Sequence, residues 1–341
     1  MRIVFVCRVY PTHRPGGMPF VVQDRAEALV HLGHDVHVIT TGRPASGVEF
    51  LNKVQIHYTQ SKPVEYSQDF AQECEAYVKS LKPKVLHLDG LDVNRPWWTN
   101  VGSDISAKAL TLHGFGMGGF LTKWNLYREG IEHFKLDFNA EKMAHEARVI
   151  RETFDTVIGI SKHEEWMLRD CYGCKNTKLV YNPIAPYFFD ENTAPATDGA
   201  PFLCAAISGQ GERGFRNAEI AAQKCGRRIR TVNDIVRSKM PYVYDECAAT
   251  VIPTAYAQGF DLTVAESLSR LRPIIASSVG SYLRDAETFA PYIKLVPLGD
   301  VDALAAAMRE TPPVVTSDAA LRFRPDFHAH AWLSAVWPWG E

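Results

Sequence analysis

The chain has 341 residues, of which 46% are hydrophobic and 22% are charged, and its formal net charge is −2. This length allows two domains, and the near-neutral balance argues against a protein that depends mainly on contacts with a nucleic-acid backbone. No apolar run reaches the roughly 18 residues of a membrane span. The apolar start at Met1–Cys7 is too short for a signal peptide, so we expect a cytoplasmic protein.

The seven cysteines are scattered along the chain, which indicates reduced thiols. Cys171 and Cys174 form a C-x-x-C pair, but a zinc site would need a second, similarly spaced pair of ligands. We interpret this segment as a helix end that turns at Gly173, and we expect no metal site.

The first hundred residues show a βαβ pattern. Ile3–Cys7 is a continuous apolar run typical of a buried parallel strand, a helix with its apolar face at Val22, Ala26 and Leu29 follows, and Val36–Thr40 predicts the next strand. Gly16 and Gly17 stand at the junction of loop and helix, where free backbone N–H groups suit an anion; a loop without a ligand is the alternative. No G-x-G-x-x-G pattern follows this strand, which argues against an NAD-linked dehydrogenase.

The next elements lead to a histidine at a strand end. We expect an edge strand at Val54–Tyr58, a helix over 70–81 and a strand at Val85–Asp89, whose His87 is structural. Ala109–His113 predicts a strand that ends in His113 just before Gly114, a position from which a side chain enters a cleft; a structural histidine is the alternative. Residues 120–138 are rich in aromatic and charged side chains and predict either an acceptor-side flap or a surface helix.

The second half repeats the alternation of strands and helices. We expect a helix over 141–151, a strand over 156–161 whose Ser161 caps the next helix, and a linker over 186–200. A strand over 202–207 follows, then a loop with Ser208 and Arg213, a helix to Cys225 and a strand over 229–232. Arg213 is either a phosphate ligand or a solvated surface residue.

The stretch from 249 to 281 is the most informative one. An apolar strand over 249–253 leads to a tight loop at Gly259, a helix from Leu262 through Glu266, and a second strand over 273–276. A glycine-containing loop that feeds a helix offers N–H donors and a positive dipole end to an anion. An ordinary loop closing onto a helix is the alternative.

This stretch resembles the donor-sugar motif of the GT-B retaining glycosyltransferases of family 4. That motif has a Glu, seven residues and a second Glu, followed by a Pro-(Val/Ile)-(Val/Ile)-Ala strand and a Val-Gly-Gly loop; here Glu266 is the second Glu and Gln258 replaces the first. Pro15-Gly16-Gly17 is similar to the family's Pro-x-Gly-Gly loop, and Glu212-Arg213-Gly214 is similar to its Glu-Lys-Gly. The family also carries a histidine at the position of His113.

The resemblance implies an α/β protein of the GT-B fold, with two Rossmann-like domains whose parallel sheets face each other across a cleft and a C-terminal helix that crosses back. It implies an N-terminal acceptor-side domain over 1–184, a trimmed nucleotide-sugar domain over 185–320 and a C-terminal segment over 321–341 that packs on the first domain. It also implies transfer, with retention, from a nucleoside diphosphate sugar to an acceptor hydroxyl, without a metal or cofactor. The acceptor is left open as a small molecule, a glycan or a nucleic acid, and so is the oligomeric state.

Site residues follow from the same resemblance. His113, Arg213 and Glu266 are the expected catalytic residues, with Arg213 at the diphosphate and Glu266 at the ribose hydroxyls. The expected donor-contact residues are Gly16, Gly17, Ser208, Gln258, Gly259, Phe260, Asp261, Leu262 and Thr263. Because Gln258 loses the charge of the usual Glu, and no Arg stands at the family's Gly-Arg position, one alternative is a nucleotide-sugar binding protein that has lost transfer activity. A glycosyltransferase acting on modified DNA bases is a second alternative, because enzymes of this fold can glucosylate such bases, although the near-neutral charge argues against it.

Overall fold

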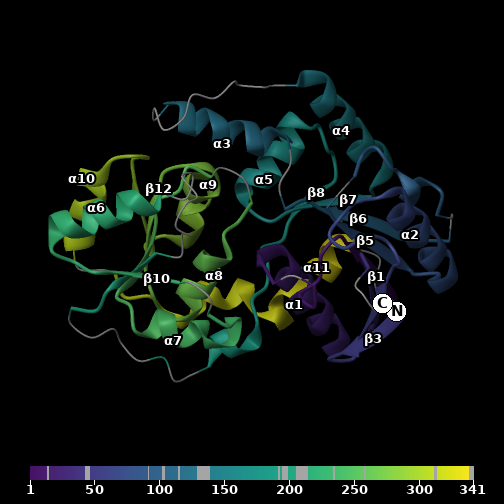
Figure 1. Ribbon diagram of the computed structural model, residues 1–341, viewed down its shortest axis with the longest axis horizontal. Helices are drawn as coiled ribbons and strands as arrows, with labels where there is room; N and C mark the ends of the chain where they lie inside the picture. Colours follow the sequence, from purple (N-terminus) through teal and green to yellow (C-terminus); the bar gives the residue numbers. More distant parts are fainter. Residues whose placement is uncertain are drawn as a thin grey trace. The chain divides into compact units, whose positions relative to one another are not determined.

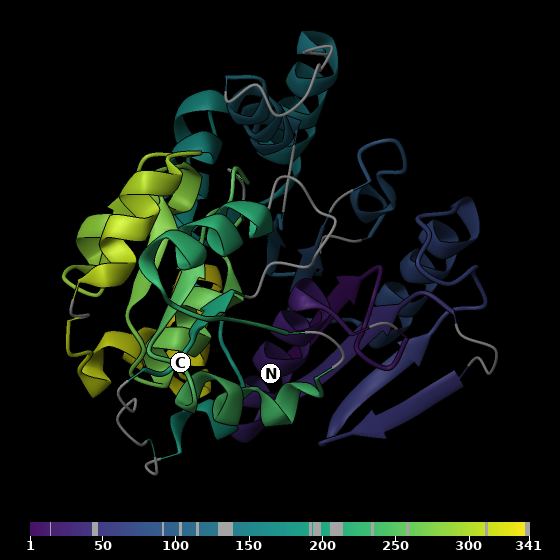
Figure 2. The ribbon, with the colours of Figure 1, turned by 60° about the vertical axis from the view of Figure 1, so that its left-hand side comes forward.

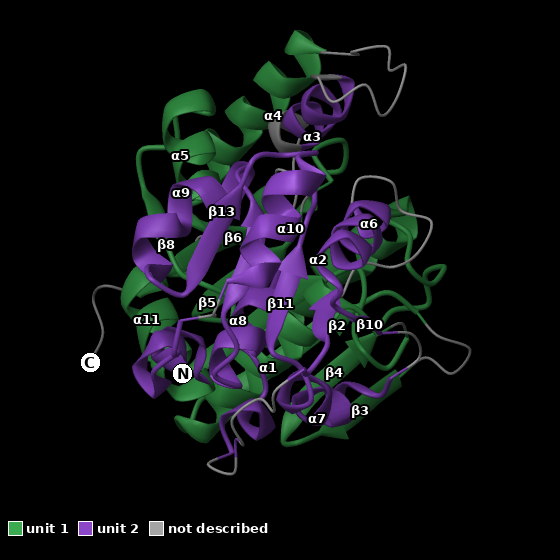
Figure 3. Ribbon diagram, turned by 90° about the vertical axis from the view of Figure 1, so that its left-hand side faces the viewer, with its two compact units in different colours: residues 1–114, 139–183, 325–341 green, residues 115–138, 184–324 purple. Residues whose placement is uncertain are grey.

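The chain folds into two compact units, which Figure 3 colours separately. Unit 1 holds residues 1–114, 139–183 and 325–341, and unit 2 holds residues 115–138 and 184–324. The computed structural model describes residues 1–13, 15–42, 47–90, 92–101, 104–113, 116–128, 139–190, 193, 199–204, 214–232, 235–256, 259–310 and 313–337.

Among the described residues, unit 1 holds an eight-stranded sheet with the order β3-β4-β2-β1-β5-β6-β7-β8 (Figure 1). Every neighbouring pair is parallel except β3 with β4. The strands are β1 (Arg2–Cys7), β2 (Asp35–Thr40), β3 (Gly47–Leu51), β4 (Val54–Tyr58), β5 (Val85–Asp89), β6 (Ala107–Thr111), β7 (Thr156–Gly159) and β8 (Thr177–Leu179).

Helices cover both faces of this sheet, which is why its central strands are continuous apolar runs. Ile3 and Phe5 of β1 pack in one cluster with residues of the first and last helices, including Trp332. Val6 faces the other way, toward Phe70 of the second helix. The helices are α1 (Gly17–His31), α2 (Gln68–Leu81), α4 (Ala140–Thr153), α5 (Lys162–Trp166) and α11 (Pro325–Val336), with short helical turns η1 (Trp97–Thr99) and η2 (Met167–Cys171).

The start of α5 and the packing of α11 agree with the sequence predictions. Ser161 accepts a hydrogen bond from Glu164 N at 3.1 Å and so caps α5. The C-terminal helix α11 packs against α1 within unit 1, which confirms the expectation that the last helix returns to the first domain.

The expected edge strand at Val54–Tyr58 is wrong in its position. This strand is β4, and it pairs with β2 on one side and with β3 on the other. The edge is β3, which was not predicted from the sequence; both appear as neighbouring blue-purple arrows in Figure 2. Val48 and Phe50 of β3 are exposed, so the segment lacks the burial that makes an inner strand recognisable.

Unit 2 contains a five-stranded parallel sheet in its described part, with the order β10-β9-β11-β12-β13. Its strands are β9 (Phe202–Cys204), β10 (Ile229–Thr231), β11 (Ala249–Ile252), β12 (Ile274–Ser277) and β13 (Ile293–Val296). The helices are α3 (Gly116–Arg128), α6 (Phe215–Cys225), α7 (Met240–Asp245), α8 (Leu262–Ser269), α9 (Gly280–Phe289) and α10 (Val301–Arg309), with short turns η3 (Pro186–Phe189), η5 (Arg237–Lys239) and η6 (Ser317–Phe323).

Two segments of unit 2 contain helical structure that was not predicted from the sequence. The expected linker over 186–200 includes the helical turn η3, which Arg270 holds through bonds to Phe188 O and Asp190 O. Gly116, Gly118 and Gly119 form the start of the helix α3, whose Asn125 side chain donates to Ala255 O at 3.1 Å.

Candidate functional site

The carboxyl edge of the unit 1 sheet carries the first group of candidate residues. Asp89 and Thr111 pair in register at the ends of β5 and β6, and His113 follows two residues later. Ligands of open parallel sheets bind at this edge, so the structure places His113 where the sequence predicts it. The His113 side chain is 14% exposed.

Behind His113 lies a buried cluster of polar side chains. Asp89 Oδ1 accepts a bond from Arg25 Nη1 at 2.9 Å and lies 3.1 Å from His113 Nε2, and both Arg25 and Asp89 are fully buried. Burial alone would raise the pKa of Asp89, but the Arg25 guanidinium and the two neighbouring histidines together hold that pKa below its usual range. The Asp89 carboxylate is therefore charged at neutral pH.

His87 and the C-terminal helix complete this cluster. Trp332 Nε1 donates to His87 Nδ1 at 3.1 Å, and His87 Nε2 lies 2.9 Å from Thr111 Oγ1. Burial lowers the pKa of His87 to about 3, so the ring is neutral. The expectation that His87 is structural agrees with its complete burial.

Gly16 and Gly17 lie at the start of α1, also in unit 1. Gly16 is the N-cap residue, and no side chain caps this end. A helix end without a capping side chain leaves backbone N–H groups available to an anion. The start of α1 therefore offers backbone N–H groups at the position of the predicted anion cradle.

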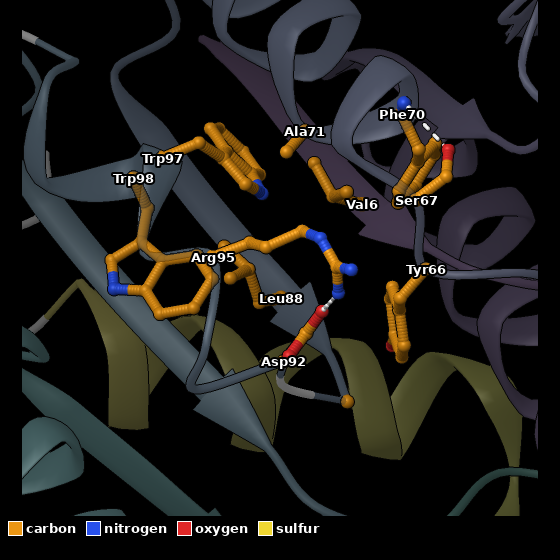
Figure 4. A pocket seen from close by; sticks show the side chains of 11 residues that line it. Val6, Tyr66, Ser67, Phe70, Ala71, Leu88, Asp92, Arg95, Trp97 and Trp98 are labelled. Carbon is orange, nitrogen blue, oxygen red and sulfur yellow. Dashed lines mark hydrogen bonds and ion pairs between the residues drawn. The ribbon is translucent and has the colours of Figure 1, made fainter.

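A narrow hollow opens beside the same sheet and was not predicted from the sequence. Figure 4 shows Arg95 reaching across it to Asp92, with Tyr66 and Trp98 on either side. Its walls also include Val6 of β1 and Leu88 of β5, besides Ser67, Phe70, Ala71, Gly90 and Trp97. Tyr66 lies in a connecting segment and Trp97 and Trp98 lie in the short turn η1, so no helical or strand periodicity in the sequence predicts that these side chains come together.

Unit 2 carries the second group of candidates at the start of α8. Gly259 has a φ of +77°, a left-handed conformation that favours glycine, and Asp261 is the N-cap residue of α8. The Asp261 side chain makes no capping bond; instead it accepts a bond from Tyr282 Oη at 2.8 Å. Phe260 is buried against Phe289 and Phe323. These contacts hold Phe260 and Asp261 in place, and Leu262 and Thr263 open the helix.

Glu266 lies in the second turn of α8 and is buried. Tyr244 Oη of α7 donates to Glu266 Oε2 at 2.9 Å. Burial raises the pKa of Glu266, although Arg237 and the Tyr244 bond act in the opposite direction. Tyr244 was not among the predicted site residues. Its position, 22 residues before Glu266 on another helix, leaves no local signal that would pair the two.

Three predicted site residues, Ser208, Arg213 and Gln258, lie outside the described residues. Of the remaining ones, the structure brings Gly259, Phe260, Asp261, Leu262, Thr263 and Glu266 together around the start of α8. Gly16, Gly17 and His113 belong to unit 1. Within the described ranges, no three His, Cys, Asp or Glu side chains are arranged to hold a metal ion, and none of the helices combines the length and apolarity that a membrane crossing requires.

Solved structures define the class of the fold. The sucrose-phosphate synthase of Thermosynechococcus elongatus superimposes with a TM-score of 0.70 at 18% identity, covering 98% of this chain and 94% of that chain. Anabaena HepE, solved in complex with UDP-glucose, gives 0.67 at 12% identity and 97% coverage of both chains. A glycosyltransferase of Rickettsia africae gives 0.66 at 13% identity, covering 98% and 94%. The fold is of the GT-B type.

Comparison with models of protein families identifies the family of this chain. Residues 15–186 match the model of Glycosyltransferase Family 4, and residues 196–311 match that of Glycosyl transferases group 1. The chain belongs to glycosyltransferase family 4, a family of retaining glycosyltransferases. Comparison with curated proteins gave no match.

Proposed function

We propose that the protein transfers a sugar from a nucleoside diphosphate sugar to an acceptor hydroxyl, with retention of configuration and without a metal ion. The observation that carries this proposal is the start of α8, where a glycine loop, a helix N-terminus and the buried Glu266 come together. Membership of family 4 supports the reaction class. The UDP-glucose complex of HepE, a protein of the same fold, supports a nucleotide sugar as donor.

The residues take separate roles in this proposal. The carboxylate of Glu266 accepts hydrogen bonds from the ribose hydroxyls, and the N–H groups at the start of α8 face the donor. Gly259, Phe260 and Asp261, with Gln258, lie near the sugar, and His113 lies beside the reacting sugar. Gly16, Gly17, Ser208 and Arg213 serve the diphosphate.

The chemistry needs charge stabilisation on the leaving group. As the glycosidic bond breaks, the departing nucleoside diphosphate gains negative charge, and donors already aimed at it lower the barrier. Arg213 supplies a planar guanidinium that matches phosphate oxygens, and the helix N-termini supply backbone N–H groups. These groups perform the task that a divalent cation performs elsewhere, so we expect activity to persist in EDTA. Attack from the face that the leaving group vacates would give retention.

The first prediction tests the donor site. A thermal-shift screen of UDP-, GDP-, ADP- and dTDP-sugars should raise the melting temperature with at least one nucleotide. With that donor, Glu266→Ala should lower kcat/KM by about 100-fold, because a buried carboxylate that binds hydroxyls is lost. Glu310→Ala is the matched control, since Glu310 is exposed and pairs only with Lys294 among the described residues; its activity should equal that of the unaltered protein.

The outcomes separate the alternatives. Full activity of Glu266→Ala would reject the assignment of the site. Tight donor binding without transfer to any acceptor pool would instead indicate a binding protein that has lost turnover, which the replacement of the family's first Glu by Gln258 makes a specific alternative. Salt-dependent affinity for DNA would point to a modified base as acceptor.

A further inference from the structure

The buried cluster behind His113 has a definite pattern of donors and acceptors. Trp332 Nε1 can only donate, so His87 Nδ1 accepts, while His87 Nε2 lies 2.9 Å from Thr111 Oγ1 and 3.3 Å from Arg25 Nη1. On the other side, Tyr181 O can only accept, so His328 Nδ1 carries a proton at 2.8 Å from it. The lone pair of His328 Nε2 therefore faces Arg25 Nε at 3.2 Å.

The contact with His328 orients the Arg25 guanidinium, and the guanidinium in turn orients the Asp89 carboxylate. The guanidinium is held by His328 through Nε, and its Nη1 donates to Asp89 Oδ1. Asp89 comes from β5, Arg25 from α1 and His328 from α11, so three elements far apart in sequence hold one carboxylate. Since Asp89 is charged and can only accept, the bond to His113 Nε2 requires the proton to lie on that nitrogen.

We propose that Asp89 is a positioning residue for His113, which it holds with the proton on Nε2 so that the Nδ1 lone pair meets a hydroxyl of the sugar substrate as a hydrogen-bond acceptor. No described residue bonds Nδ1, and the ring is partly exposed. The inference rests on the proposed role of His113 beside the sugar. It specifies the direction of the hydrogen bond between them: the substrate hydroxyl donates and His113 Nδ1 accepts.

The alternative is that Asp89 only neutralises the buried Arg25 and that its contact with His113 has no effect on turnover. The two explanations differ in one respect. If Asp89 acts through His113, its substitution matters only while His113 is present. If the role of Asp89 is purely structural, its substitution lowers kcat by the same factor whether His113 is present or replaced.

The kinetic test is a double-mutant cycle with the donor that the thermal-shift screen identifies. Asp89→Asn should lower kcat by about 10-fold or more with little change in donor affinity, as the loss of a partner that orients a reacting group commonly does. In a His113→Ala background the same substitution should change kcat less than about 2-fold. Independent, multiplicative losses would overturn the proposal.

Asp35→Asn is the matched control. Asp35 lies 3.1 Å from His37 Nε2, so this is a second aspartate–histidine pair of the same length, at the amino end of β2. Its substitution should leave kcat unchanged. Full activity of His113→Ala would also overturn the proposal, while the Glu266→Ala experiment would still report separately on the glycosyltransferase assignment.

A spectroscopic measurement avoids any dependence on the folding of Asp89→Asn, in which Arg25 would lose its counter-charge. The protein labelled with ¹⁵N-histidine is observed by NMR at neutral pH, and the His113 signals are assigned by their loss in His113→Gln. We expect a protonated Nε2 and an unprotonated Nδ1 in the unaltered protein. The opposite tautomer would contradict the proposal.

Discussion

At the scale of single residues, the contact between Tyr244 and Glu266 gives a prediction about donor binding. Burial raises the pKa of the Tyr244 phenol well above its usual value, so it stays protonated and donates to Glu266 Oε2. That bond fixes the rotation of the carboxylate. Tyr244→Phe removes the donor while it keeps the ring, and the donor Kd should rise about 10-fold, since a hydrogen bond to a charged group contributes roughly 1.5–3 kcal/mol.

The control for this substitution lies on the same helix. Tyr242 is 63% exposed, so Tyr242→Phe should leave the donor Kd unchanged in a calorimetric titration. An unchanged Kd in Tyr244→Phe would show that Glu266 is oriented without the phenol.

Residues that lie at the ends of elements could be predicted, and residues that support them from behind could not. His113 follows an apolar strand and Glu266 follows a glycine loop, so the local pattern places both. Asp89 also ends an apolar strand, and this local position was a signal that could have identified it. Arg25 lies in the buried stripe of α1, 64 residues from Asp89, and neither residue's neighbours indicate that pairing.

At the scale of elements, α6 begins so close to β11 that the residue just before it must be glycine. A Cβ on Gly214 would lie 1.8 Å from Pro253 O, and the residue has a φ of +68°. Gly226, at the other end of α6, has a φ of +67°, but a Cβ added there would meet nothing within 4 Å. The two glycines therefore share a backbone conformation and differ in the space around them.

This pair allows the cost of the close approach to be measured. Gly226→Ala should lower the free energy of unfolding by about 1 kcal/mol, the strain of a left-handed alanine. Gly214→Ala should lower it by about 3 kcal/mol or more, because the backbone must also move away from Pro253. Urea denaturation of both variants checks this, and equal losses would contradict it. Because Gly214 follows Arg213, donor affinity should fall in Gly214→Ala alone.

Most helices and strands could be predicted from the periodicity of apolar residues and from the residues at their ends, whereas the edge strand of the unit 1 sheet could not. β1, β2 and β5 are buried on both faces and so show as apolar runs. The side chains of β3 are mostly exposed, and the segment is recognisable as a strand only through its antiparallel pairing with β4. Strand order depends on partners that are distant in sequence, which is why β4 was placed at the edge.

At the scale of the whole molecule, the chain leaves unit 1 twice, and its second return brings α11 into that unit. The return of α11 followed from the family resemblance, whereas its contribution of His328 and Trp332 to the cluster around His87 did not. Five histidines are buried in unit 1: His37, His57, His87, His163 and His328. This concentration makes the stability of unit 1 depend on pH.

Burial lowers the pKa of four of these histidines, His37, His57, His87 and His328, below the usual value near 6.5, to about 4 for His57 and about 3 for His87. Between pH 6.5 and 4 the unfolded chain therefore binds protons that the folded chain does not. The free energy of unfolding should fall as the pH drops through this window, by about 1.4 kcal/mol per pH unit for each ring that is protonated in the unfolded chain alone. Asp89, whose pKa is lowered in the folded protein, adds a further loss below about pH 4.

Urea denaturation at pH 8, 7, 6 and 5 measures this dependence. Stability should be nearly constant from pH 8 to 7 and then fall. His57→Gln is the informative variant, because it removes one titrating group whatever its effect on absolute stability: the slope near pH 5 should decrease by about 1.4 kcal/mol per pH unit. A flat profile down to pH 5 would mean that these rings take up protons in the folded state. The buried bonds of His87 and His328, and with them the support of Asp89, would then have to be rearranged at that pH.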